Sequence, residues 1–159
     1  MNTNQLPIIK YTLNGQNDII DPNEDLWINE GNIVKECAEQ SAKYAFYGSL
    51  HVDYFSTLEV LKNSIKKYEA ENEKTMRHRI GVNYGDKERI TEAKLEAEFL
   101  RDEGWQSLNQ MRLDTDKTVR LLEVIKDAFK QRSQQLWNIA ATKRQENTNV
   151  MNSLNNEDN

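Results

Sequence analysis

The sequence has little of what a disulfide scaffold, a loop-rich globule or a membrane protein needs. It contains one cysteine, so no disulfide can form within the chain, and we expect Cys37 to be a small core residue in a reducing compartment. Two prolines and six glycines are few for a chain with many loops. No stretch approaches the roughly 20 apolar residues of a membrane span, and the first ten residues lack a signal-peptide pattern. We therefore expect a soluble, cytoplasmic protein.

Motifs for catalysis and for metal binding are also missing. There is no Gly-rich phosphate loop and no His-Glu-x-x-His sequence. The two histidines, His51 and His78, lie too far apart along one predicted helix to share a metal within one chain. Glu92 and Glu96 lie one helical turn apart and suit either a divalent cation or, more ordinarily, a solvated acidic face. We expect no enzyme, no metal and no cofactor.

Two long stretches have the composition and spacing of helices. Of the 159 residues, 37% are apolar and 30% are charged, which suits long helices with solvated outer faces better than a thick layered core. The predicted seam of residues 32–80 is Ile33, Cys37, Ser41, Tyr44, Gly48, His51, Phe55, Leu58, Ile65 and Tyr68. That of the second stretch is Leu108, Met111, Thr115, Thr118, Leu122, Ile125, Phe129, Arg132, Leu136 and Ile139. Most steps are three or four residues, typical of helix packed on helix.

The segment between these stretches, residues 81–90, contains two glycines and predicts a turn. Thr91 predicts the N-cap of the second helix, and Gly104 predicts a dent or a break near residues 102–104. Two long helices joined by a short turn are antiparallel neighbours. We therefore predict an all-α fold, a long antiparallel helical hairpin over residues 32–146.

The two ends of the chain lie outside this hairpin. β-Branched and aromatic residues precede Asn14-Gly15, and Ile19-Ile20 follow it. Because Asn-Gly suits a tight two-residue turn, residues 7–20 predict a short β-hairpin. Because an isolated hairpin is marginal in water, it must dock on the helices or on a neighbouring subunit. Asp21-Pro22-Asn23 then breaks the chain, so residues 1–31 form an N-terminal arm. Residues 147–159 are rich in asparagine and predict a disordered tail.

Aromatic residues surround the first helix instead of following one side of it. A helix that is apolar on several faces needs more partners than one hairpin supplies. We therefore predict a homo-oligomer. The interface residues we expect are Tyr44, Phe46, Tyr47, Tyr54 and Phe55. The three tryptophans are expected as core or interface anchors: Trp27, Trp105 and Trp137.

Positive charge concentrates in two zones of this acidic chain, whose net charge is -5. Residues 62–89 carry eight bases against five acids, and residues 117–146 carry seven against three. The first zone surrounds the predicted turn, where dense positive charge with an aromatic side chain suits phosphates and unpaired bases. The alternative is a charged tip that keeps the hairpin soluble. The candidate DNA-binding residues are Lys74, Arg77, His78, Arg79, Tyr84, Lys87 and Arg89.

Three blocks of the sequence resemble the UvsY-type recombination mediators of tailed phages. The first is Ser41-Ala-Lys-Tyr-Ala-Phe-Tyr-Gly-Ser-Leu50. The second is Met76-Arg-His-Arg79 with Tyr84-Gly85 after it. The third is Ile90-Thr91-Glu92-Ala93, followed by a helix with Ala128-Phe129-Lys-Gln-Arg132 and continuing to Arg144. The resemblance covers residues 32–146 and leaves out both ends of the chain.

The resemblance implies a helical protein that assembles into a ring, binds single-stranded DNA and helps to load a RecA-like recombinase onto DNA coated by single-strand-binding protein. Arg77 and Arg79 match the family's DNA-contacting basic pair, although Asp86 and Glu88 make this turn more acidic than the family's. The alternative from another functional class is a structural coiled-coil scaffold or assembly chaperone without nucleic-acid binding.

Overall fold

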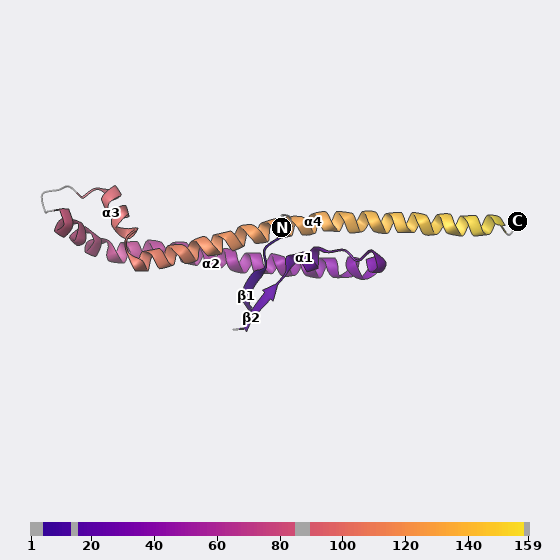
Figure 1. The fold of residues 1–159 in the computed structure, drawn as a ribbon, viewed down its shortest axis with the longest axis horizontal. Coiled ribbons are helices and arrows are strands. Elements are labelled where there is room, and N and C mark those ends of the chain that lie inside the picture. Colours follow the sequence, from indigo (N-terminus) through magenta and orange to yellow (C-terminus); the bar gives the residue numbers. More distant parts are fainter. Residues whose placement is uncertain (1–4, 14–15, 85–89, 158–159) are drawn as a thin grey trace. The chain divides into compact units, whose positions relative to one another are not determined.

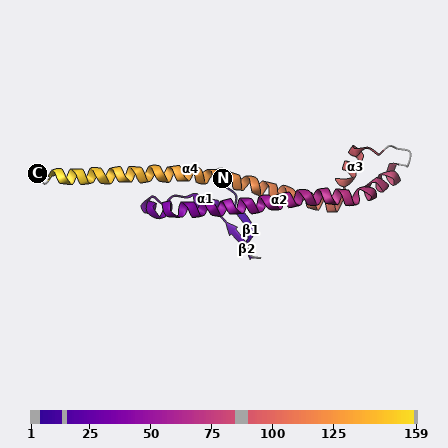
Figure 2. The ribbon, with the colours of Figure 1, turned by 180° about the vertical axis from the view of Figure 1, so that it is seen from behind.

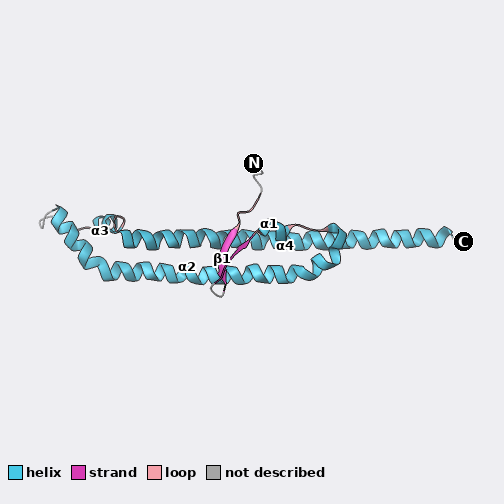
Figure 3. Cartoon of the chain, turned by 60° about the horizontal axis from the view of Figure 1, so that its bottom comes forward, coloured by secondary structure: helices cyan, strands magenta, loops and turns pink. Residues whose placement is uncertain are grey.

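The structure, a computed structural model, describes residues 5–13, 16–84 and 90–157. Its elements are β1 (Ile9–Leu13), β2 (Gln16–Ile20), α1 (Pro22–Leu26), the 3-10 turn η1 (Glu30–Asn32), α2 (Ile33–Tyr84), α3 (Glu92–Phe99) and α4 (Glu103–Glu157). Helices dominate the fold, as predicted (Figure 1, Figure 3). The chain forms two compact units: unit 1 is Met1–Leu50 with Leu121–Asn159, and unit 2 is His51–Arg120. None of the described helices is long and apolar enough to cross a membrane.

The N-terminal β-hairpin belongs to unit 1. Strands β1 and β2 pair antiparallel, with Ile9 opposite Ile20, and the register leaves two positions between the strands. Those positions are residues 14 and 15, which lie outside the described part of the chain. The ring of Tyr11 meets the ring of Phe46 on α2 edge to face at 6.1 Å, and Ile9 is buried. The predicted hairpin is confirmed, and it docks on a helix of its own chain.

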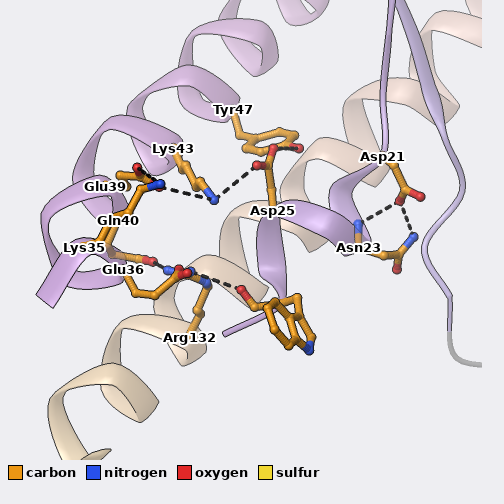
Figure 4. Close-up of polar contacts among 11 residues, drawn as sticks. Asp21, Asn23, Asp25, Lys35, Glu36, Glu39, Gln40, Lys43, Tyr47 and Arg132 are labelled. Carbon is orange, nitrogen blue, oxygen red and sulfur yellow. Dashed lines mark hydrogen bonds and ion pairs between the residues drawn. The ribbon is translucent and has the colours of Figure 1, made fainter. Parts of the chain in front are cut away.

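Helix α1 begins where the sequence predicted only a break. Asp21 is its N-cap, and the Asp21 carboxylate accepts a hydrogen bond from the Asn23 backbone N–H at 2.9 Å. Pro22 stands in the first turn, where its missing N–H leaves no hydrogen bond unmade. The Asn23 side chain bonds both the N–H and the carbonyl of Leu6 at 2.9 Å. The Asp-Pro-Asn sequence therefore ends the strand and starts a helix (Figure 4).

The core of unit 1 lies between α2 and α4. Tyr47 and Phe129 are completely buried, with ring centroids 5.0 Å apart. Burial raises the pKa of the Tyr47 hydroxyl, which donates a hydrogen bond to Asp25 of α1 at 2.9 Å. On α4 the buried apolar positions of unit 1 are Leu122, Ile125, Phe129 and Leu136. These four follow the seam predicted for the second helix.

The first half of α2 packs one residue out of the predicted register. The structure buries Gln40, Tyr47 and Leu50, whereas Cys37 and Ser41 are exposed. The prediction that Cys37 is a core residue is therefore wrong. Gln40 and Tyr47 can be buried because their polar tips are satisfied. The Gln40 amide donates to the Phe129 carbonyl at 2.8 Å.

A buried arginine joins three segments of unit 1. Arg132 of α4 is 2% exposed, and its guanidinium donates to the Glu36 carboxylate and to the Gln40 side chain, both on α2. It also donates to the Trp27 carbonyl at 3.3 Å. Figure 4 shows Arg132 directed at Glu36 and Gln40 across the interface. Because buried charges need partners, this cluster fixes the N-terminal arm and both helices in one arrangement.

Unit 2 has its own core where α3 packs on the last turns of α2. Its buried cluster is Met76, Ile80, Leu95 and Phe99, with Tyr68, Ile90 and Trp105 partly buried against it. Helix α2 continues to Tyr84, past the predicted end at residue 80. The helix passes Gly81 because one interior glycine costs only about 1 kcal/mol. The predicted turn is therefore shorter, and residues 85–89 lie outside the described part.

The break between α3 and α4 falls at Asp102, as the sequence predicted. Thr91 caps α3, which is also as predicted, and the Asp102 carboxylate accepts a hydrogen bond from the Trp105 backbone N–H at 3.1 Å. The same carboxylate accepts from the Tyr68 hydroxyl at 2.6 Å. This hydrogen bond from Tyr68 is the main reason that the pKa of Asp102 is lowered. Asp102 therefore starts α4 and also ties it to α2.

Gly104→Ala is expected to lower the thermal midpoint, although alanine normally stabilises a helix. A Cβ at residue 104 would lie 2.4 Å from the Tyr68 hydroxyl oxygen and 2.9 Å from its Cζ atom. Tyr68 cannot move away without losing its hydrogen bond to Asp102. Gly48→Ala in α2 is the matched control, because its Cβ would meet nothing within 4 Å. Gly48→Ala should raise the free energy of unfolding by about 0.5–1 kcal/mol. Thermal unfolding followed by circular dichroism checks both variants. A higher thermal midpoint for Gly104→Ala than for the wild type would contradict the packing of residue 104 against Tyr68.

Helix α4 extends to Glu157, so residues 147–157 are helical where the sequence predicted a disordered tail over 147–159; the last two residues lie outside the described part. The physical reason is that no proline or glycine follows Gly104, so nothing in the sequence breaks the helix earlier. In unit 1 the last turns of α4 run past the start of α2 (Figure 1, Figure 2). Side chains from Arg144 to Met151 are exposed.

Candidate nucleic-acid-binding site

The predicted basic residues that the structure describes lie together on the last turns of α2, in unit 2. Lys74 and His78 are exposed, and the side chains of Arg77 and Arg79 are 37% and 48% exposed. Tyr84 closes the helix, but its side chain lies outside the description, as do Lys87 and Arg89. The apolar seam continues through Met76 and Ile80 between these bases. The basic pair therefore flanks the seam.

Arg77 is already paired with two carboxylates. Its Nε–H donates to Glu73, one turn earlier on α2, at 2.7 Å. Its Nη2 lies 3.4 Å from the carboxylate of Glu92, in the first turn of α3. The hydrogen bond to Glu73, followed by the nearby negative charge, raises the pKa of Arg77 above its ordinary value. Arg77 is therefore a permanent cation whose charge is locally compensated.

Arg79 is paired in a different way. Its Nη1 lies 3.3 Å from the Asp102 carboxylate, whose side chain is 11% exposed. The Asp102 carboxylate is held in place, because it also caps α4 and accepts a hydrogen bond from the Tyr68 hydroxyl. The side chain of Arg79 is more exposed than that of Arg77, and its ion pair uses one of the two terminal nitrogens. Arg79 therefore has N–H donors left for an anion while it stays paired with Asp102.

A cleft of about 440 Å³ opens beside Arg77, between α2 and α3. Its apolar side is formed by Leu95, Phe99 and Trp105. Four carboxylates line it as well, from Glu69, Glu73, Glu92 and Glu96. The Trp105 indole N–H donates to Glu69 at 2.8 Å. The immediate surroundings of Arg77 are thus more acidic than a count of bases along the sequence indicates.

Sequence reasoning missed this acidic wall. The spacing of the glutamates indicated two acidic helix faces, because Glu69 and Glu73 share one face of a helix, as do Glu92 and Glu96. What spacing did not show is that α3 folds back onto α2 and brings the two faces together. Among the described residues, no group of three or more His, Cys, Asp or Glu is arranged to hold a metal ion.

The predicted oligomer-interface residues have different surroundings. In unit 1, Tyr47 is fully buried in its own chain, so it packs inside the hairpin and not on another subunit. Tyr44 is partly buried, and Phe46 is 36% exposed beside Tyr11. In unit 2, Tyr54 is partly buried and Phe55 is 49% exposed. Phe46 and Phe55 are thus the members of this set with the largest free surface.

Two tryptophans of unit 1 are exposed, so they do not lie in the core of this chain, and their expected role as interface anchors stays a prediction. Trp27 is 66% exposed and Trp137 is 69% exposed. A second cleft, of about 480 Å³, lies between the N-terminal arm and α4. It is lined by Leu26, Trp27, Ile28, Glu30, Gln135, Asn138 and Ile139. Trp105 of unit 2 is partly buried and belongs to the α3 core.

Comparisons with known proteins add one distant similarity. No protein-family profile matches the chain, and no curated protein matches it in sequence. Among solved structures, the chain is similar to the crystal structure of the bacteriophage T4 recombination mediator protein UvsY. The identity is 15%, the alignment covers 79% of this chain and 92% of that chain, and the TM-score is 0.49. A similarity of this size carries no argument about binding or activity.

Proposed function

We propose that the chain is a non-enzymatic, single-stranded DNA-binding protein that acts as a recombination mediator. The observation that carries the proposal is the gathering of Lys74, Arg77, His78 and Arg79 at one end of α2, where all four side chains reach solvent at least partly. Arginine binds phosphate through a fork of N–H donors. These four residues include the basic pair in the sequence block that resembles the UvsY-type family.

Within this proposal the protein works as a homo-oligomeric ring. It presents single-stranded DNA to a RecA-like recombinase and helps to displace single-strand-binding protein. Exposed apolar side chains such as Phe55 and Trp137 support self-association, because a single subunit on its own leaves them in water. Repeating the basic end of α2 in every subunit multiplies weak phosphate contacts along one strand.

A second candidate function, a structural scaffold, is favoured by the carboxylates around Arg77. The cleft beside this residue brings four glutamates to one arginine. An acidic wall of this kind repels a phosphate backbone. The exposed bases at the same end of α2 argue against the scaffold, because a scaffold has no need of them.

One titration separates the two functions. We expect the wild-type protein to bind a fluorescent oligothymidylate, with log affinity falling linearly as log salt rises. Each phosphate contact should contribute about 0.7 to the slope. An oligonucleotide duplex of equal charge tests the preference for single strands. If fluorescence anisotropy shows no salt-sensitive binding to the single strand, the scaffold function replaces this proposal.

A further inference from the structure

The guanidinium of Arg77 has two separate anionic contacts, and they differ in kind. Glu73 belongs to the same helix and takes the Nε–H at 2.7 Å. This contact is local and holds the side chain along α2. Glu92 comes from α3 and lies 3.4 Å from the terminal Nη2 atom. A phosphate approaching from solvent needs the terminal nitrogens, so it meets the Glu92 carboxylate and not that of Glu73.

The fold fixes the place of Glu92. Leu95 and Phe99 of α3 are buried against Met76 and Ile80, which lie on either side of Arg77 along α2. The Thr91 side chain caps the same end of α3, so the helix that carries Glu92 begins at a defined residue. The packing of α3 therefore delivers a carboxylate to one cation of the proposed DNA-binding site.

The contact is nevertheless easy to exchange. The side chain of Glu92 is 86% exposed, and that of Arg77 is 37% exposed. Exposed ion pairs of this kind contribute little to stability. A DNA strand, which brings many phosphates at once, can replace one weakly held carboxylate. The same strand gains nothing from displacing Glu73, because that pair leaves the terminal nitrogens accessible.

We propose that Glu92 competes with the phosphates of single-stranded DNA for Arg77, so that the docked α3 helix lowers the affinity of the basic end of α2. This inference rests on the proposed function and names the residue that regulates its site. Glu73 is a positioning residue in this arrangement. The competition keeps the protein from binding every polyanion tightly and favours a strand that reaches several subunits.

The test is Glu92→Gln measured against Glu96→Gln with the fluorescent oligothymidylate at several salt concentrations. Glu96 lies one turn further along α3 in the same cleft, and its substitution changes the net charge equally. Both variants gain some affinity from that general change. Glu92→Gln should gain about two- to fivefold more than Glu96→Gln. In an Arg77→Ala background the two substitutions should give equal gains. Circular dichroism confirms that α3 stays folded in both variants.

The outcomes separate this inference from the proposed function. Equal gains for Glu92→Gln and Glu96→Gln in the wild-type background, with Arg77→Ala still weakening binding, overturn the competition alone. Weaker binding by Glu92→Gln also overturns it, because Glu92 would then be holding Arg77 ready for DNA. If neither the wild-type protein nor Glu92→Gln binds the strand, both the competition and the proposed function are wrong.

Discussion

Arg132→Ala is expected to destabilise unit 1 by about 3–5 kcal/mol, the usual cost of removing one partner from a buried ion pair. The guanidinium is 2% exposed and contacts Glu36, Gln40 and the Trp27 carbonyl. Its loss leaves the Glu36 carboxylate, whose side chain is 13% exposed, without this partner. It also removes one link between the arm and α4, the hydrogen bond to the Trp27 carbonyl. Urea unfolding followed by circular dichroism measures the change.

Two further variants test the cause. Arg120→Ala removes an exposed arginine that pairs with Asp116 on the same helix, so its effect should stay within about 0.5 kcal/mol. Arg132→Met leaves Glu36 charged and unpaired, whereas Arg132→Met with Glu36→Gln removes that charge too. The double variant should recover a large part of the loss. If Arg132→Met and the double variant are equally unstable, lost packing and not the unpaired charge is responsible.

Arg77→Ala combined with Arg79→Ala is expected to weaken binding to single-stranded DNA by about tenfold or more, since one charge-assisted hydrogen bond is worth about 1.5 kcal/mol. The slope of log affinity against log salt should fall by about 0.7 for each lost phosphate contact. Both side chains reach solvent, so the thermal midpoint should change little. In an oligomer the loss repeats in every subunit that touches the strand. Fluorescence anisotropy at several salt concentrations measures affinity and slope together.

Lys66→Ala with Lys67→Ala is the matched control for this pair. It removes the same charge from the same helix, at exposed positions before the cluster. It should reduce affinity only slightly, through long-range electrostatics. A larger loss for the lysine pair than for the arginine pair would move the DNA-binding site away from the end of α2.

The elements that the sequence predicted well are those in which apolar spacing alone decides the packing. In unit 1 the seam of α4 contains Leu122, Ile125, Phe129, Arg132 and Leu136 at unbroken steps of three and four, so its buried face was predictable. The β-hairpin and the Thr91 cap follow from local turn and cap chemistry in the same way. Local rules suffice where no distant partner changes the outcome.

The register of the first half of α2 was misjudged because polar residues take core positions. Gln40 and Tyr47 are buried only because Phe129 and Asp25, far away in the sequence, accept their hydrogen bonds. A hydropathy pattern has no way to reveal those acceptors. The line through Cys37 and Phe55 was therefore preferred, and the side chains of these two residues are exposed.

The candidate site was predictable in its bases and not in its acids. Arg77 and Arg79 stand out in the sequence, but their partners Glu92 and Asp102 lie 15 and 23 residues further on. Their pairing depends on how α3 folds back after a connection that spacing does not determine. Base counts along the chain consequently overstated the free positive charge of this end of α2.

The division of the chain into two units sets the order in which its contacts can form during synthesis. Unit 2 is one continuous segment, and its polar links between helices span 15 to 36 residues. Unit 1 joins segments from both ends, and the bonds made by Gln40 and Arg132 span 89 to 105 residues. Closing longer loops costs more chain entropy. On the ribosome, the bonds of Gln40 and Trp27 to the part of α4 after Leu121 must therefore wait until that part has been synthesised, after all of unit 2.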